Sequence, residues 1–181
     1  MKTTEEVKET KEIKEIKEIK EIKEIKEIYK TAFGSYPQFD EPFFEAFSDC
    51  AKTYKENGKT VSVLFLLPCT IKGERIYYLF AAATKRGEEN KGYMTKLLFS
   101  VLNETKEPIF LKPATDSLVE FYKKRGFVKT IGKATGGEIK IEVSKEIEHL
   151  SALCDRCPSE FVLMTSKKLP YSSLEFPYIM Q

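Results

Sequence analysis

The sequence has no long apolar run and no marked excess of charge of one sign. Its longest apolar stretch, Val61 to Leu67, ends at Pro68 and is far too short to cross a bilayer. The first residues, Met1 to Glu6, are polar, which excludes a secretory signal of the usual kind. The formal net charge is only +2, whereas a dedicated nucleic-acid binder normally has a strongly basic face. We therefore expect a cytoplasmic protein with neither a membrane nor a nucleic-acid partner.

Histidine and cysteine are also scarce. The only histidine is His149, and the four cysteines are Cys50, Cys69, Cys154 and Cys157. His149 with Cys154 and Cys157 gives three zinc ligands but no fourth, so we expect no bound metal. A Ser-His-Asp hydrolase built on His149 lacks a preceding nucleophile elbow. The thiols are expected to be reduced, Cys154 and Cys157 as ordinary loop thiols and Cys50 and Cys69 in or near the core.

The charge of the chain is concentrated at one end. Its 181 residues are enough for one ordinary domain, and 32% of them are charged, above the usual quarter. Residues 1–30 contain nine lysines and nine glutamates, and the rest has a normal charge content. We therefore divide the chain into a low-complexity segment, residues 1–21, and a globular domain, residues 22–181.

The segment Lys11 to Ile28 repeats Lys-Glu-Ile six times. Three residues turn an α-helix by about 300°, so the isoleucine stripe slips by about 60° per repeat and cannot serve one core face throughout. A partner-binding or dimerising helix is one interpretation; we favour a simple-sequence expansion of a first helix that Gly34 ends. We expect one group of side chains to face the core, Ile22, Ile25, Ile28, Tyr29 and Phe33, and another to point elsewhere, Ile13, Ile16 and Ile19.

The remaining sequence predicts an α+β domain, a sheet with helices covering it. A breaker-rich loop is expected over residues 34–42. Helices are expected over residues 41–57, 91–103 and 115–125. Strands are expected over residues 61–67, 75–84, 109–112, 127–133, 138–143 and 161–165, the first two as an antiparallel pair and the fourth and fifth as a hairpin around Gly136-Gly137.

Two segments about thirty residues apart contain the candidate site. Leu79 to Leu98 is a strand, a polar loop and a helix start at Gly92, and such a junction presents unpaired backbone N–H groups to an anion. Gly92 lets the backbone approach a phosphate closely. The second segment, Pro113 to Phe127, is a short helix with a tyrosine before its terminal glycine.

Together these segments resemble the GNAT superfamily of acyl-CoA-dependent N-acetyltransferases. The family's Phe/Leu-Tyr-x-x-x-Gly-Phe signature is matched by Phe121, Tyr122, Gly126 and Phe127. Gly92 matches the key glycine of the family's Gln/Arg-x-x-Gly-x-Gly/Ala turn, whose amides hold the pyrophosphate of coenzyme A. The resemblance covers residues 22–143 and implies a mixed, mostly antiparallel central sheet flanked by helices, here with an extended N-terminal helix.

The chain departs from the family pattern in the pyrophosphate turn. Glu89 replaces the usual Gln or Arg, Asn90 replaces a frequent glycine, and Met94 replaces the second Gly or Ala. Because backbone amides do most of the pyrophosphate binding in this family, we expect these side-chain changes to weaken the affinity for coenzyme A and not to remove the resemblance to the family. The negative charge of Glu89 can be offset by nearby bases, Lys85, Arg86, Lys91 and Lys96.

The resemblance also implies roles for individual residues. Main-chain groups of Ala82, Ala83 and Thr84 would contact the pantetheine arm of acetyl-CoA. Tyr122 would be the general acid that protonates the leaving thiolate, since a phenol has a pKa of about 10 against about 8.5 for a thiol. Packing of Tyr122 beside its aromatic neighbours is the alternative interpretation. The pyrophosphate would be held mostly through amides of Glu89, Asn90, Lys91, Gly92, Tyr93, Met94 and Thr95.

The resulting hypothesis is transfer of an acetyl group from acetyl-CoA to a primary amine of a small molecule or peptide by direct attack in a ternary complex. The alternative is a catalytically degenerate GNAT-like module that binds a CoA ester or a protein. A monomer or a homodimer fits either.

The general base stays open at this point. The strand over residues 76–80 has no acid, so water relayed through Tyr77 or Tyr78, or the C-terminal carboxylate of Gln181, could serve. Three acids near the second helix are either an acidic rim for a cationic amine or solvated surface: Asp40, Glu41 and Glu45.

Overall fold

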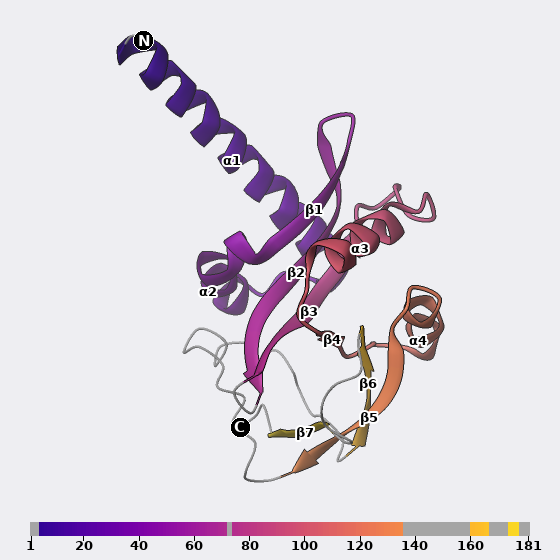
Figure 1. Ribbon diagram of the computed structural model, residues 1–181. Helices are drawn as coiled ribbons and strands as arrows, with labels where there is room; N and C mark the ends of the chain where they lie inside the picture. Colours follow the sequence, from indigo (N-terminus) through magenta and orange to yellow (C-terminus); the bar gives the residue numbers. More distant parts are fainter. Residues whose placement is uncertain (1–3, 72–73, 136–159, 167–173, 178–181) are drawn as a thin grey trace.

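The computed structural model of the chain describes residues 4–71, 74–135, 160–166 and 174–177. In this part of the chain one mixed sheet, in the strand order β1-β2-β3-β4-β6-β5-β7, is covered by helices, which confirms the predicted α+β class (Figure 1). The elements in chain order are α1 (Thr4–Phe33), α2 (Pro37–Phe47), a short 3₁₀ helix (Ser48–Cys50), β1 (Ala51–Glu56), β2 (Lys59–Ile71), β3 (Glu74–Thr84), α3 (Tyr93–Glu104), β4 (Ile109–Leu111), α4 (Asp116–Lys123), β5 (Val128–Thr135), β6 (Glu160–Thr165) and β7 (Leu174–Pro177).

The sheet is mostly antiparallel, as expected. β2 pairs antiparallel with β1 and β3, and β6 pairs antiparallel with β4 and β5. Two pairs are parallel, β3 with β4 and β5 with β7. The expected strand over residues 138–143 and its Gly136-Gly137 turn lie outside the described residues, as do His149, Cys154, Cys157 and Gln181.

β2 is buried on both faces, which explains its continuous apolar sequence. Successive side chains of a strand point to opposite faces. Val63 and Phe65 pack into the core cluster under α1 and α2, whereas Leu64 and Leu66 pack into the cluster under α3 and α4. Cys50 packs against the first of these clusters, in line with the expected core position. Two helices therefore cover each face of the sheet.

The predicted helix over residues 41–57 is wrong in its second half. α2 ends at Phe47, and residues 51–56 form β1, which pairs with β2. Asn57 (φ 50°) and Gly58 (φ 73°) connect Glu56 to its partner Lys59, so they form a two-residue hairpin turn of the type that favours Asn-Gly. Gly58 thus closes a hairpin and does not end a helix.

The breaker-rich loop expected over residues 34–42 is also shorter than predicted. α2 begins at Pro37, in the first-turn position where the missing N–H of proline costs no helical hydrogen bond. Pro42 lies inside the helix. The phenylalanines that follow it in the helix are buried: Phe43, Phe44 and Phe47. The packing of this aromatic face therefore outweighs the helix-breaking effect of the proline.

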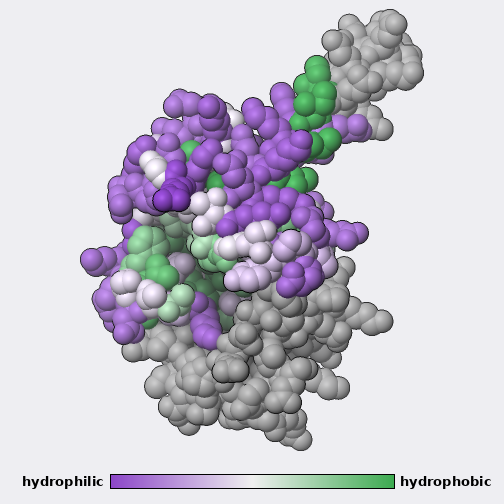
Figure 2. All heavy atoms as spheres, turned by 180° about the vertical axis from the view of Figure 1, so that it is seen from behind, coloured by the Kyte–Doolittle hydropathy of each residue, from purple (hydrophilic) through white to green (hydrophobic). Residues whose placement is uncertain are grey.

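α1 is one helix whose two ends differ in packing. At its C-terminal end, three of its side chains are buried in the core, as predicted: Ile25, Ile28 and Tyr29. Ile22 and Phe33, expected in the same group, are instead 37% and 44% exposed. For Ile22 the reason is the three-residue period, which carries the isoleucine stripe off the core face. As expected, another group does not join the core and is mostly exposed, Ile13, Ile16 and Ile19. Figures 1 and 2 show this part of α1 projecting away from the sheet.

Contacts between the repeat and the sheet begin at Glu21. Its carboxylate accepts hydrogen bonds from the Thr53 hydroxyl at 2.9 Å and from the Lys55 ammonium at 2.7 Å. Glu24 accepts one from the main-chain N–H of Thr60 at 3.0 Å. Within the described residues, no helix has the length and apolar character that crossing a membrane requires.

We predict that deletion of residues 1–18 changes the free energy of unfolding by less than about 1 kcal/mol, because the removed isoleucines are exposed. Ile28→Ala, at the packed end, should cost about 2–5 kcal/mol. Urea unfolding of both variants tests this. A large loss of stability on deletion, or a dimer that becomes a monomer in sedimentation, would show that the projecting end is packed.

Candidate functional site

The sheet opens between β3 and β4. These strands pair only at Tyr77 with Ile109 and at Tyr78 with Phe110. Just beyond, Ala81 has a φ of 51°, and the register of β3 against β2 shifts between the partners of Val63 and Phe65. Such a β-bulge bends its strand, and here it coincides with the end of the β3–β4 pairing.

A cleft of ≈ 340 Å³ occupies this opening. Its walls come from β3, from the end of β4 and the residues after it, from α4, from the last turn of α1 and from the turn before α2. On the face shown in Figure 2, a hollow is lined by green and near-white residues. The lining residues are Tyr29, Phe33, Tyr36, Tyr78, Leu79, Phe80, Ala81, Ala82, Leu111, Lys112, Pro113, Ala114, Leu118 and Tyr122.

Tyr122 reaches the cleft from α4. The helix starts at Thr115, whose hydroxyl accepts a hydrogen bond from the Leu118 N–H. The Tyr122 side chain is 6% exposed, and its ring makes edge contacts with Phe121 and Phe127. Burial raises the pKa of Tyr122 to about 12, opposed only in part by the nearby Arg125 charge, so the phenol keeps its proton at neutral pH.

The start of α3 has the features of an anion site. Gly92 is the N-cap, with a φ of 79°, and no side chain of the described residues caps the free N–H groups of the first turn. Apart from its chain neighbours, a Cβ at Gly92 would meet no atom of the described residues within 4 Å, so this part of the structure leaves the space in front of the backbone open. Asn90 also has a positive φ, 63°, which asparagine tolerates better than most residues. These features fit a diphosphate.

The charges of this loop are partly neutralised within it. The Glu89 carboxylate accepts a hydrogen bond from the Gly87 N–H, and the Lys91 ammonium lies 2.7 Å from the Glu88 carboxylate. Lys96 lies over the stacked rings of Tyr54 and Tyr93. The acid that replaces the family's Gln or Arg is therefore engaged by its own loop.

Arg125 joins the two segments that the sequence singled out. Its Nε and Nη2 donate to the Thr95 hydroxyl at 3.0 and 2.6 Å, and its Nη1 donates to the Phe121 carbonyl at 2.6 Å. The guanidinium also lies 3.4 Å from the centroid of the Phe121 ring. The first turn of α3 is thereby tied to the helix that carries Tyr122. Sequence reasoning missed Arg125, although it directly precedes the signature glycine.

The predicted pantetheine contacts fall at different places around the bulge. Ala82 lines the cleft. The Ala83 side chain is buried in the cluster under α1 and α2, and the Thr84 hydroxyl lies 2.9 Å from the Ser62 hydroxyl. The side chains of the last two point elsewhere, so only their main chain is available for the predicted role. The pyrophosphate residues, Glu89, Asn90, Lys91, Gly92, Tyr93, Met94 and Thr95, are at the start of α3 and do not line the cleft.

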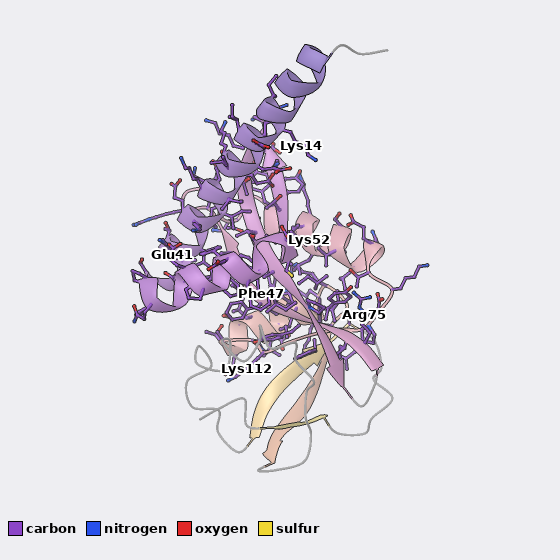
Figure 3. The ribbon with its side chains drawn as sticks, turned by 90° about the vertical axis from the view of Figure 1, so that its left-hand side faces the viewer. Lys14, Glu41, Phe47, Lys52, Arg75 and Lys112 are labelled. Atoms are coloured by element: carbon purple, nitrogen blue, oxygen red, sulfur yellow. The ribbon has the colours of Figure 1, made fainter. Side chains whose placement is uncertain are left out.

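The candidates for the general base differ in whether they line the cleft. Tyr78 lines the cleft, whereas Tyr77 lines a different pocket together with Arg75. None of the three acids near α2 lines the cleft. Asp40 is 1% exposed, Glu41 pairs with two lysines, and Glu45 is exposed. Figure 3 shows Glu41 on α2, beside the end of α1. No cluster of three or more potential metal ligands occurs among residues that the structure describes.

Three aromatic residues of the cleft were not predicted for the site: Tyr29, Phe33 and Tyr36. The first two were assigned to the core stripe of α1. The only signal for the third was an aromatic residue in a turn between two helices.

No protein-family model and no curated protein matches the sequence. Solved structures do match, at low identity. PH1933 from Pyrococcus horikoshii is 15% identical, with a TM-score of 0.53 over 83% of this chain and 92% of that one. A histone acetyltransferase HPA2-related acetyltransferase from Corynebacterium glutamicum is 13% identical, with a TM-score of 0.50 over 87% and 94%.

A GCN5-related N-acetyltransferase from Kribbella flavida is 14% identical, with a TM-score of 0.50 over 60% of this chain. The matched region is 31% of that longer protein, so this chain spans about a third of it. The chain therefore has the fold of the GNAT N-acetyltransferases, which confirms the expected fold class.

The two buried phenols of the cleft predict a loss of stability in alkali. Burial raises the pKa of Tyr29 and of Tyr122 from 10.0 to about 12. Between these values the unfolded chain has released protons that the folded protein still holds, so stability is full below pH 10 and falls as the pH rises towards 12. We expect a loss on the order of 1 to 3 kcal/mol for each ring. Urea unfolding across this range should show a shallower fall for Tyr122→Phe; an unchanged slope would contradict the assigned shift.

Proposed function

We propose that residues 22–181 form an N-acetyltransferase that moves an acetyl group from acetyl-CoA to a primary amine in a ternary complex. One observation carries the proposal: a buried phenol opens onto the cleft between β3 and β4, and Arg125 ties its helix to the uncapped start of α3. The fold agrees with this activity, since two of the similar structures are described as acetyltransferases.

In the proposal, acetyl-CoA binds through main-chain groups on both sides of the bulge. The edge of β3 beyond Tyr78 has no β4 partner among the described residues, so the N–H and C=O groups that point away from β2 are available to the pantetheine amides. Ala82, Ala83 and Thr84 occupy this edge. The amides from Glu89 to Thr95 would hold the diphosphate at the positive end of the α3 dipole.

Within this complex the amine nitrogen forms a bond to the acetyl carbonyl carbon while the carbon–sulfur bond breaks. Sulfur leaves with the electron pair and takes the proton of the Tyr122 hydroxyl. The nitrogen loses a proton to water, for which Tyr78 is the better placed of the two candidate relay tyrosines. Solvent then restores the proton of Tyr122. With a pKa of about 12 the phenol is protonated at neutral pH and therefore carries the proton that the thiolate takes.

Gly92→Glu should abolish acetyl-CoA binding in calorimetry while the fold persists, because a side chain and a charge then fill the proposed phosphate position. Gly58→Glu is the matched control. Gly58 has a similar φ of 73°, also meets nothing within 4 Å, and lies in the β1–β2 turn. Unchanged affinity of a folded Gly92→Glu variant would contradict the site assignment.

Tyr122→Phe should lower kcat by about a hundredfold to ten-thousandfold with nearly unchanged acetyl-CoA affinity, because the ring packing stays and only the proton donor is lost. Tyr54→Phe removes a phenol outside the cleft and serves as control. Turnover of Tyr122→Phe within about threefold of wild type, with chemistry rate-limiting, would support packing as the sole role of this residue.

The same assays distinguish the degenerate alternative. A chain that binds acetyl-CoA in calorimetry but releases no thiol with any amine in a broad panel is a binding module and not an enzyme.

A further inference from the structure

One arm of the cleft, under the end of α1, is built from aromatic rings. Tyr29 is buried, with its ring centroid 5.2 Å from that of Phe33, and Phe33 and Tyr36 are 44% and 56% exposed. Tyr78 and Phe80 of β3 line the same cleft. Large exposed rings gathered in a concave site are typical of a surface that contacts a ligand.

The turn between α1 and α2 holds Tyr36 in place. Gly34 has a φ of 88°, and a Cβ there would lie 3.2 Å from Cε2 of Tyr36, so a glycine lets this ring lie against the backbone. The main-chain N–H of Tyr36 donates to Asp40 Oδ2 at 2.8 Å, and Asp40 is 1% exposed. A buried carboxylate therefore fixes the backbone that carries an exposed ring. Such preorganisation lowers the entropic cost of binding.

The largely apolar lining of the cleft disfavours a cationic acceptor. Among the described lining residues, Lys112 is the only charged one, and Figure 3 shows it below α2. Attack on the acetyl carbon requires a neutral amine. Apolar surroundings disfavour the ammonium form, so the cleft shifts a bound amine towards the reactive state. A polyamine would bring further charges into the same apolar surroundings.

We infer that the acceptor is a primary amine carried on an aromatic or apolar group, which packs against Phe33 and Tyr36. This inference rests on the proposed acetyl transfer and adds the substrate class. A free arylalkylamine and a peptide amino terminus with an aromatic first residue share this chemistry, so the test includes both.

The test measures release of the CoA thiol by the full-length chain with four acceptors: 2-phenylethylamine, a tripeptide beginning with phenylalanine, spermidine, and lysine with its α-amino group blocked. We expect kcat/KM for at least one aromatic acceptor to exceed both cationic ones by about tenfold or more. The faster aromatic acceptor identifies the source. Tyr36→Ala should lower its kcat/KM about tenfold and leave the Kd of acetyl-CoA unchanged.

Phe99→Ala is the control, because Phe99 is 47% exposed on α3 and does not line the cleft. Preference for spermidine or blocked lysine, or equal effects of Tyr36→Ala and Phe99→Ala, overturns the inference when acetyl-CoA binding is intact. Failure to bind acetyl-CoA overturns the proposed function, and the inference with it.

Discussion

The whole site depends on the limited pairing of β3 with β4. A strand edge presents N–H and C=O groups that require hydrogen-bond partners, and neighbouring strands usually supply them. Here β4 pairs with β3 at only two positions, and the bulge at Ala81 bends β3 at that point. Among the described residues, no strand pairs with the β3 edge beyond Tyr78, so a ligand can take this place. A ligand with amide groups along its length is suited to this position because it can act as a short additional strand.

A cluster of aromatic rings fixes the geometry around this opening. The Phe43 ring contacts the rings of Tyr29 on α1, Phe65 on β2 and Phe80 on β3, with centroids 5.8, 4.8 and 5.4 Å apart. Aromatic pairs of this kind contribute about 0.5–1.5 kcal/mol each beyond their buried area. Since Phe43 belongs to α2, one side chain sets the distance between both N-terminal helices and the strand that carries the bulge. The aromatic arm of the cleft is the outer surface of this cluster.

Local patterns in the sequence predicted most elements but misled in one region. The helix predicted over residues 41–57 includes most of α2, which buries Phe43, Phe44 and Phe47, but it runs on into the residues of β1. The Asn57-Gly58 pair was the stronger signal for a hairpin. Residues 51–56 form a strand because they pair antiparallel with β2, and this tertiary contact outweighs their local helical pattern.

The candidate site was predictable where a motif carried it. Gly92 and Tyr122 were found because each lies in a short recognisable segment. The aromatic arm was not found, because Tyr36 and the β3 residues that line the same cleft are more than forty residues apart in sequence, and nothing local marks that they share it. The bond between Arg125 and Thr95 is a similar case: both residues lie in predicted segments, but only the folded chain shows that they meet.

The repeat runs from the projecting end of α1 into its packed end, and this position has a genetic consequence. The buried positions of α1 lie at fixed distances in sequence before Gly34. Residues at the positions of Ile25, Ile28 and Tyr29 therefore stay in the core whatever precedes them. Each Lys-Glu-Ile unit corresponds to three codons, and its gain or loss preserves the reading frame. A change of one unit lengthens or shortens the projecting helix by about 4.5 Å without moving any residue of the cleft. Related chains are therefore expected to vary freely in repeat number while their sheets and clefts superpose.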